Sequence, residues 1–360
     1  MKRIFIGIDW LLFIPAIILA IIGLAVIGSL APDLFFHQLF YFIIGISLFL
    51  IFGIIDFRIF ERLRLVIFIL AIFFLATPLI FGQITRGVVR WLGIGPFKLQ
   101  PSELIKPFMV IFFAGYFIRQ GKITAKNFVY SLLLLSIPIF LIFIQPDLGS
   151  SLVVAFSWLG ILLAADITFK SVIVYLAPFV LALPMLWRFL KDYQKQRILA
   201  FINPLKDPMG SGYNLMQAMI AAGSGQLFGR GLGRGTQSHL RFLPEYFTDF
   251  IFASLCEELG FVGAMLTLIL FGVILWRILV IGKKAGNIGM LICVGIFSYL
   301  FIQIVINIGM NLGMLPITGI PLPLISYGGS SFITTMISLG IISNISRLKK
   351  EPVSGIMSFK

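Results

Sequence analysis

The chain has 360 residues, of which 59% are hydrophobic and only 12% are charged, and its mean hydropathy is +1.07. A soluble domain is about half apolar and about a quarter charged, so this composition excludes a soluble protein and indicates a polytopic membrane protein. The net charge of +14 would suggest nucleic acid in a soluble protein. Here most Lys and Arg residues lie in short segments between apolar runs, where they orient the chain in a membrane. We therefore expect no nucleic-acid partner.

Ten segments are apolar over the roughly 20 residues that a helix needs to cross a bilayer. In chain order they are 10–30, 35–55, 65–82, 102–118, 127–145, 148–166, 170–190, 249–277, 288–312 and 328–346. The sequence thus predicts an all-α protein with ten transmembrane helices, forming one integral membrane domain over residues 1–360. With the N-terminus inside, more than half of the 28 Lys and Arg residues fall in inside segments, which places both termini in the cytoplasm. Two long connections are then outside, 83–101 and 191–248, and the second separates the seventh helix from the eighth.

One acidic residue, Asp249, lies where the long polar connection meets an apolar run. A carboxylate near hydrocarbon is costly, so it needs a partner, a wet cavity or a function. In one interpretation Thr248 caps a helix that begins at residue 249, and Asp249 stabilises its positive end. In the other, Asp249 faces a cavity, because Ala253, Cys256 and Gly260 are small and share a helix face. The two interpretations are compatible, and the sequence leaves both open.

Other acidic and basic residues lie at or near the ends of predicted helices. Glu103 and Lys106 open the fourth helix with i, i+3 spacing, so they can form an ion pair that is either structural or part of a site. Asp147 lies between the fifth and sixth helices, where it either caps a helix or binds a ligand. Glu257 and Glu258 lie deeper in the eighth helix and need protonation or a basic partner. A structural ion pair explains these two glutamates as well as a role in catalysis does.

Two outside stretches have unusual backbone composition. The run 223–238 interleaves glycines with Arg230 and Arg234, which favours close approach to an anion such as a phosphate, although a flexible solvated loop explains it equally well. A nucleotide-binding P-loop is excluded, because the Gly-Lys-Ser/Thr ending and a preceding strand are missing. The run 315–331 holds three prolines, then Ser326, then Gly-Gly-Ser-Ser. Such backbone at membrane depth is either an ordinary break buried in protein or the lining of a wet cavity.

Ligands for a metal ion are scarce in the sequence. The only histidines are His37 and His239, and the two cysteines, Cys256 and Cys293, both fall in predicted helices. These residues form no recognisable ligand cluster, and a Ser-His-Asp hydrolase lacks its parts. The sequence therefore identifies no metal site and no cofactor, and it leaves open whether a divalent cation takes part.

Together these stretches resemble the SEDS family of membrane proteins, and they look more like its RodA members than like FtsW. The motifs follow the family's order: Arg90-Trp91, Gln100-Pro-Ser-Glu103-Leu-Ile-Lys106, Gln145-Pro-Asp147-Leu-Gly, the run 223–238, Thr248-Asp-Phe-Ile-Phe-Ala, Glu257-Glu-Leu-Gly and Gly319-Ile-Pro-Leu-Pro-Leu-Ile-Ser-Tyr-Gly-Gly-Ser-Ser. The resemblance implies a peptidoglycan glycosyltransferase of the bacterial cytoplasmic membrane. Such an enzyme polymerises lipid II at the outer face and works with a class B penicillin-binding protein. The family's essential aspartate corresponds to Asp249. Phe247 is a departure, because the family usually has histidine there.

From this resemblance we expect Asp249 to be the general base that activates the acceptor hydroxyl, with inversion at the anomeric carbon. The candidate substrate-binding residues are Arg90, Glu103, Lys106, Asp147, Arg230, Arg234 and Ser326. The arginines would stabilise the pyrophosphate that leaves, whereas Glu103, Lys106 and Asp147 would shape the cavity and hold the helices in register.

Two other functions remain open on the sequence. A flippase for a lipid-linked precursor suits buried charges and broken helices equally well, and a non-catalytic scaffold would position the transpeptidase. A flippase should carry polar groups through the full depth of the membrane. Here the motifs cluster at the predicted outer face, and the inner halves of most helices are interpreted as apolar. A scaffold would tolerate the loss of Asp249.

Overall fold

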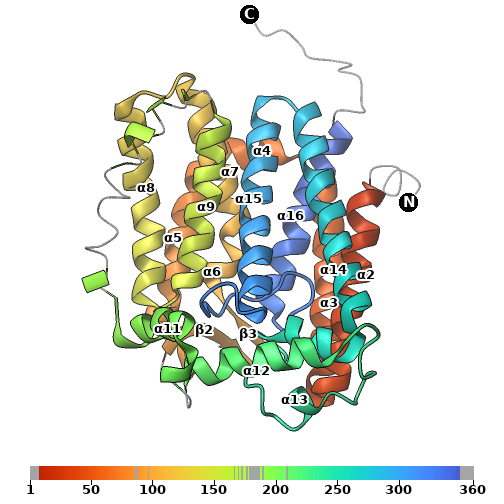
Figure 1. The fold of residues 1–360 in the computed structure, drawn as a ribbon. Coiled ribbons are helices and arrows are strands. Elements are labelled where there is room, and N and C mark those ends of the chain that lie inside the picture. The colour runs from red at the N-terminus through yellow and green to blue at the C-terminus, as the bar shows by residue number, and fades with distance from the viewer. Residues whose placement is uncertain are drawn as a thin grey trace, which may run out of the picture.

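The computed structural model describes residues 8–348, except for 86–87, 96, 166, 169, 172, 176, 178–186, 189 and 208–209. Its main body is a bundle of long helices: α2 (Trp10–Leu30), α3 (Pro32–Ile54), α5 (Arg64–Phe81), α7 (Lys106–Gln120), α8 (Ala125–Ile144), α9 (Leu148–Ala164), α14 (Ile251–Lys284), α15 (Asn287–Asn311) and α16 (Gly329–Leu348). These helices run roughly side by side (Figure 1). The short helix α4 (Phe57–Arg62) links α3 to α5, and α6 (Pro101–Leu104) leads into α7.

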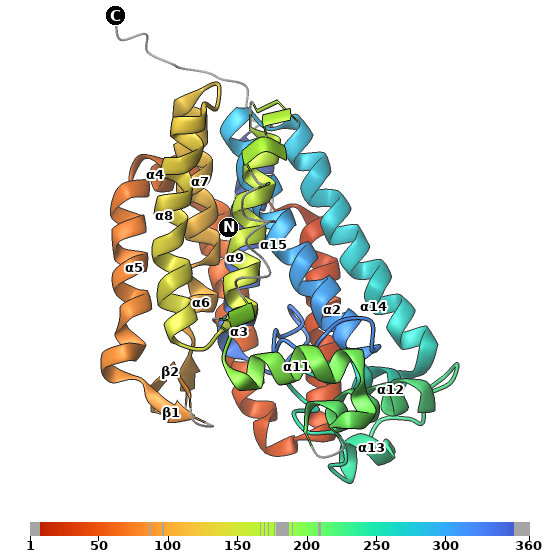
Figure 2. The same cartoon turned by 60° about the vertical axis from the view of Figure 1, so that its left-hand side comes forward.

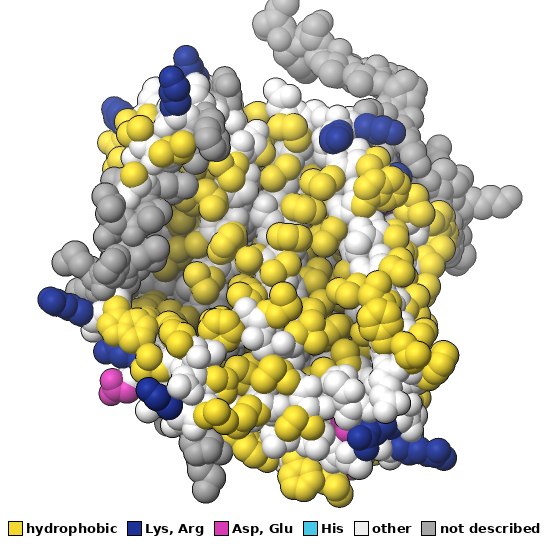
Figure 3. Space-filling model, in the orientation of Figure 1, with side chains coloured by type: hydrophobic (Ala, Val, Ile, Leu, Met, Phe, Trp, Pro, Cys, Tyr) yellow, Lys and Arg dark blue, Asp and Glu magenta, His cyan; other side chains and the backbone are white. Residues whose placement is uncertain are grey.

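Within the described residues, eight helical segments are long and apolar enough to cross a membrane, and α9 is a shorter apolar helix of 17 residues. They coincide with the predicted spans except for the seventh, 170–190, most of which lies outside the described residues. Hydrophobic side chains cover the middle of the face in Figure 3, and Lys and Arg gather towards its two ends. The predicted class, an all-α polytopic membrane protein, is confirmed, while the count of ten helices stays a prediction.

Helix α16 lies at the centre of the bundle. Of its most apolar stretch 83% is buried, against 22% for α3 and for α5. Small residues let helices approach closely, and a Cβ on Gly340 of α16 would lie only 2.7 Å from the carbonyl oxygen of Phe49 in α3. Helix α16 is rich in Ser and Thr, and α5 is almost wholly apolar. The polar composition of α16 therefore marks a helix that its neighbours shield from lipid.

A layer of short elements covers one end of the bundle (Figures 1 and 2). It contains an antiparallel sheet in the order β1 (Gln83–Thr85), β2 (Val88–Ile94) and β3 (Phe97–Leu99). It also contains α11 (Asp192–Ile202), the 3-10 turn η1 (Pro204–Lys206), α12 (Ser211–Ser224) and α13 (Thr236–His239). Residues from both long connections, 83–101 and 191–248, thus contribute to one layer. The sheet within the first of them was not predicted.

At the opposite end of the bundle, Asp9, the residue before α2, connects α2 to α14 and α16. Arg277 of α14 donates to both carboxylate oxygens of Asp9, at 3.0 and 2.7 Å, and Ser346 of α16 donates to the same carboxylate at 3.0 Å. Asp9 is buried. A buried carboxylate with a basic and a hydroxyl partner therefore lies at this end, and its partners are far apart in the sequence.

Helix α14 is broken at Gly260, whose φ of 69° and ψ of −168° are not helical. The loop that carries the glycine-rich run crosses the helix at this break. The amide of Phe261 donates to the carbonyl oxygen of Gln226 at 2.8 Å, so a loop residue replaces the usual partner one turn back in the helix. A Cβ on Gly260 would lie 2.2 Å from the backbone nitrogen of Gly229. The crossing therefore requires a residue without a side chain.

The small residues Ala253, Cys256 and Gly260 do not line a cavity, in contrast to the second interpretation of Asp249. Ala253 is fully buried in a cluster of apolar side chains, and Gly225 of the loop lies directly against the backbone at Cys256. The small residues on this face admit another segment of backbone instead of leaving space.

Replacing Gly225 by alanine is expected to destabilise the crossing, because the added Cβ would lie 1.8 Å from the carbonyl oxygen of Cys256. Overpacking a tight contact costs about 1–3 kcal/mol. Gly223→Ala is the matched control, since a Cβ there would meet no atom within 4 Å. Thermal unfolding in detergent should give a lower midpoint for Gly225→Ala than for Gly223→Ala, and equal midpoints would contradict the close crossing.

Candidate functional site

Asp249 lies at the covered end of the bundle, in a turn that directly precedes α14. The helix begins at Ile251 with Phe250 in the N-cap position, and no side chain caps it. The expectation that Thr248 caps a helix starting at residue 249 was therefore wrong. The hydroxyl of Thr248 instead donates to the carboxylate of Glu245 at 3.0 Å. Asp249 is half-buried, so it stays accessible on the covered side.

Hydrogen bonds from distant segments hold the backbone of this turn. Ser326 donates its hydroxyl to the carbonyl oxygen of Thr248 at 2.7 Å. Asn307 and Asn311, one turn apart on α15, both donate side-chain amides to the carbonyl oxygen of Asp249 at 3.0 Å. All three donors are buried. They fix the main chain at Asp249 independently of its carboxylate, as a preorganised functional group requires.

Phe247, the departure from the family pattern, lies in an aromatic cluster. Its ring packs edge to face against Tyr246 and Tyr327, with centroids 5.1 and 5.7 Å apart, which is a favourable geometry for aromatic rings. The amide of Tyr327 also donates to the carbonyl oxygen of Phe247 at 2.9 Å. Burial raises the pKa of the Tyr327 phenol, so this hydroxyl stays protonated at neutral pH. Phe247 thus packs the turn in place.

Arg197 of α11 approaches the carboxylate of Asp249 across Gly319. A Cβ on Gly319 would lie 3.4 Å from Oδ2 of Asp249 and 3.8 Å from Nη1 of Arg197, so both groups border the space beside this glycine. The φ of Gly319 is 76°, which other residues rarely adopt. The guanidinium of Arg197 also lies 5.8 Å from the ring centre of Tyr193. Sequence reasoning missed Arg197, because no local pattern separates it from the other basic residues of 191–248.

Arg90 of β2 and Tyr193 of α11 donate hydrogen bonds to the same carbonyl oxygen. Its Nη2 donates to the carbonyl oxygen of Pro146 at 2.5 Å, and the hydroxyl of Tyr193 donates to the same oxygen at 3.2 Å. Because Tyr193 also contacts Arg197, these residues connect the sheet, α11 and the turn before α9. The structure therefore places Arg90 and Arg197 in one connected group.

Asp147 is the N-cap residue of α9, and its Oδ1 accepts the amide of Ser150 at 3.1 Å. The capping interpretation is thereby confirmed. Its Oδ2 accepts the side-chain amide of Gln100 at 2.7 Å and the hydroxyl of Ser102 at 3.1 Å. All four residues are buried. Both carboxylate oxygens are thus engaged within the protein, where they join α6 to α9.

Glu103 and Lys106 form the predicted ion pair where α6 meets α7. Nζ of Lys106 lies 2.5 Å from Oε1 of Glu103, and the side chains of Lys106 and Glu103 are only 2% and 3% exposed. The hydroxyl of Ser150 in α9 donates to the same oxygen at 3.4 Å. Because this ion pair is enclosed and is also contacted from α9, it holds α6, α7 and α9 in register.

The glycine-rich run surrounds carboxylates of the protein itself. Glu257 is fully buried, and one of its oxygens accepts both the amide and the hydroxyl of Ser238, at 3.1 and 2.7 Å. Glu258 is also buried and accepts the amide of Gly233 at 3.1 Å, with the ring of His239 at 3.0 Å. The sequence left open whether this run approaches a phosphate or forms a flexible solvated loop. In the structure its backbone amides bind the carboxyl groups of these two glutamates.

Arg230 and Arg234 have exposed side chains on this run. Arg230 donates to the hydroxyl of Thr236 at 3.1 Å, within the same loop. Their exposure leaves them able to meet an anion at the surface. The guanidinium that borders the space beside Asp249 is, however, that of Arg197.

Fold and site together define a class: a helical membrane protein that fixes a carboxylate beside a guanidinium at one end of its bundle, beneath a layer of short elements. Among the residues that the structure describes, no group of three or more His, Cys, Asp and Glu side chains could hold a metal ion. A family model for FtsW, RodA and SpoVE, described as cell cycle protein, matches residues 5–351. The chain belongs to this family, the SEDS family that its motifs predicted.

Individual relatives agree with this assignment. The peptidoglycan glycosyltransferase MrdB of Escherichia coli K12 is 40% identical over 298 residues, covering 81% of this chain and 80% of its own length. A chain solved in a peptidoglycan synthase complex that coordinates polymerization and crosslinking has a TM-score of 0.83 at 28% identity, covering 96% of this chain and 99% of that one. The rod shape determining protein RodA of Thermus thermophilus has a TM-score of 0.71 at 28% identity, with 96% and 98% covered. The predicted likeness to RodA is thus confirmed.

Proposed function

We propose that this chain is a peptidoglycan glycosyltransferase that polymerises lipid II into glycan strands at the outer face of the bacterial cytoplasmic membrane during cell elongation. The observation that carries the proposal is the turn at 247–249, whose clamped backbone holds the carboxylate of Asp249 beside Arg197. The similarity to MrdB, which is named for this activity, supports it.

The proposed reaction joins a sugar hydroxyl of one substrate to the anomeric carbon of another. Asp249 accepts the hydroxyl proton as the oxygen attacks, because an alcohol is a poor nucleophile without a general base. The bond from the anomeric carbon to the pyrophosphate breaks, and the lipid pyrophosphate leaves with the electron pair. A single carboxylate that acts as base, without a covalent intermediate, implies inversion at the anomeric carbon.

The departing pyrophosphate develops negative charge, which a fixed cation stabilises in the transition state. Arg197 is our first candidate for this role, since it borders the space beside Asp249. Arg90 is the second, through its link to Tyr193. Arg230 and Arg234 are assigned to the approach of the headgroup, because they are exposed. A divalent cation bound with the substrate is compatible with this arrangement.

The remaining predicted substrate-binding residues are assigned to positioning. Ser326 donates to the backbone next to Asp249, Asp147 caps α9, and the pair Glu103–Lys106 joins α6 and α7 to α9. All of them are buried. Each acts by holding a wall of the site in place.

We further propose that a class B penicillin-binding protein is the partner and that both termini lie in the cytoplasm. A structural relative belongs to a peptidoglycan synthase complex, which supports a transpeptidase partner. Arg277 and Ser346 meet Asp9 at the end away from the site, and this arrangement supports termini on one side with the site on the other.

The test is polymerisation by the purified full-length chain. Labelled lipid II is added in detergent, with and without the transpeptidase, and glycan strands are separated by gel electrophoresis. Strands whose lengthening requires this chain are the expected result. Absence of strands under both conditions would overturn the proposal and would favour a scaffold. Movement of lipid II across proteoliposomes without polymer would favour a flippase.

Replacing Arg197 by glutamine is expected to lower the polymerisation rate roughly a hundredfold, the loss typical of removing one donor to a developing charge. Arg197→Lys keeps the charge but not the planar fork, so it should retain an intermediate rate. Lys206→Gln removes an exposed positive charge from the same layer and is the control. Initial rates with labelled lipid II measure all three, and equal rates for Arg197→Gln and Lys206→Gln would contradict the role of Arg197.

A further inference from the structure

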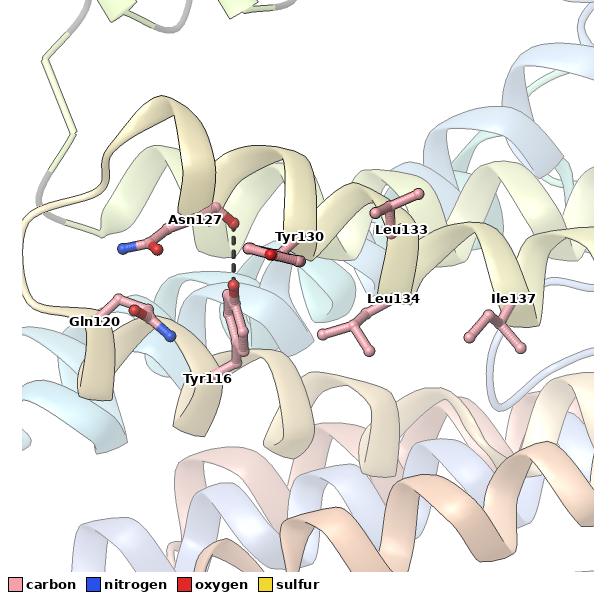
Figure 4. A pocket seen from close by; sticks show the side chains of 7 residues that line it. All are labelled: Tyr116, Gln120, Asn127, Tyr130, Leu133, Leu134 and Ile137. Carbon is pink, nitrogen blue, oxygen red and sulfur yellow. Dashed lines mark hydrogen bonds between the residues drawn. The ribbon is translucent and has the colours of Figure 1, made fainter.

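A groove lies between α7 and α8, at the end of the bundle away from the proposed site. Its volume is about 460 Å³, within the range of pockets that hold small molecules. Tyr116 and Gln120 project into it from α7, facing Asn127 and Tyr130 of α8 (Figure 4). The hydroxyl of Tyr116 donates to the carbonyl oxygen of Asn127 at 3.0 Å. This end of the groove, next to the connection between the two helices, is therefore polar.

The groove changes character along α8. Leu133, Leu134 and Ile137 line its other end, deeper in the span of α8 (Figure 4). Leu133 and Ile137 are exposed, so this part opens sideways towards the bilayer. Hydroxyl and amide groups at the membrane surface, followed by branched aliphatic side chains at depth, match the headgroup and the acyl chain of a lipid.

The charge around the polar end selects the kind of lipid. Arg119, Lys122 and Lys126 are all exposed there, and the sequence has no Asp or Glu between Glu103 and Asp147. The ammonium of Lys126 lies 5.9 Å from the ring centre of Tyr130 at the rim of the groove. One acidic residue approaches from another element: Glu61 lies 3.7 Å from Arg119. The balance stays positive, and basic pockets between transmembrane helices bind anionic headgroups.

We propose that this groove is a binding site for one anionic phospholipid of the cytoplasmic leaflet, with its phosphate at Lys122 and Lys126 and an acyl chain along Leu133 and Ile137. The site is independent of glycan polymerisation, because it lies at the opposite end of the bundle from Asp249. Basic loop residues alone would attract anionic lipid diffusely, whereas a groove with a polar rim retains one molecule.

The test is lipid retention by the full-length chain. The protein is incubated in mixed micelles with equal amounts of phosphatidylglycerol and phosphatidylcholine, freed of excess lipid by gel filtration, and analysed by native mass spectrometry. The wild type is expected to retain one phosphatidylglycerol in preference to phosphatidylcholine. Leu133→Trp, which fills the exposed part of the groove, should lose bound lipid of both kinds.

In the double variant Lys122→Gln, Lys126→Gln, the preference for phosphatidylglycerol should fall roughly twenty-five-fold, since each basic residue near a membrane surface contributes about fivefold. Lys283→Gln with Lys284→Gln is the matched control, because it removes two exposed charges at the end of α14. An equal loss in this control would reduce the effect to diffuse surface charge and overturn the proposal. A wild type that retains no lipid would also overturn the proposal, and a protein segment would then be the alternative occupant of the groove.

Discussion

Replacing Asp249 by asparagine is expected to lower the rate of glycan formation from lipid II at least about a hundredfold. An amide accepts no proton at neutral pH, and general-base catalysis contributes about 10²–10⁴ to a rate. The side chain keeps its shape, and the main chain at residue 249 stays clamped by Asn307 and Asn311. The fold should therefore survive. Initial rates with labelled lipid II, together with thermal unfolding in detergent, measure the two effects separately.

Asp33→Asn is the matched control for this experiment. Asp33 is an exposed carboxylate in the first turn of α3. The N-terminal end of α3 lies at the covered end of the bundle (Figure 1). Its replacement should leave the polymerisation rate unchanged, so a loss there would point to a general effect of charge. A wild-type rate in Asp249→Asn, with an unchanged unfolding midpoint, would contradict the role of Asp249 as the general base.

The long helices could be predicted because apolar length is a local property of the sequence. Their ends were less predictable. The eighth span was expected to end at Arg277, yet α14 continues to Lys284, because Arg277 is paired with Asp9 of a helix that is distant in the sequence. The sheet 83–99 was missed for a similar reason, since its three strands are short and are defined by their mutual pairing.

The site shows the same division between local and distant information. Asp249 was predictable, because a carboxylate next to an apolar run is conspicuous. Arg197 was not, since only the packing of α11 near Gly319 brings it to the carboxylate. The glycine-rich run was interpreted as suited to an anion, and in the structure its backbone amides bind the carboxyl groups of Glu257 and Glu258. A pattern can thus indicate what a segment binds without indicating whether the ligand is external.

The ion pair between Glu103 and Lys106 provides the second large effect that we expect. Removing one partner from a buried pair costs about 3–5 kcal/mol, because an uncompensated charge remains in a medium of low polarity. Glu103→Gln and Lys106→Met should each lower the free energy of unfolding by this amount. The effect should extend to α9, because the hydroxyl of Ser150 also contacts Glu103. Chemical or thermal unfolding in detergent measures the loss.

The double variant Glu103→Gln, Lys106→Met separates the cost of an orphaned charge from the value of the pair. With both charges gone, stability should recover most of the single losses, since replacing a buried pair by neutral groups is often close to neutral. Arg119→Met is the control for surface pairing: Arg119 is 59% exposed and lies 3.7 Å from Glu61, so its loss should cost no more than about 1 kcal/mol. Losses in the double variant that equal the sum of the single losses would mean that the two charges do not interact. Glu103 and Lys106 would then act separately, and the register of α6, α7 and α9 would not depend on their pairing.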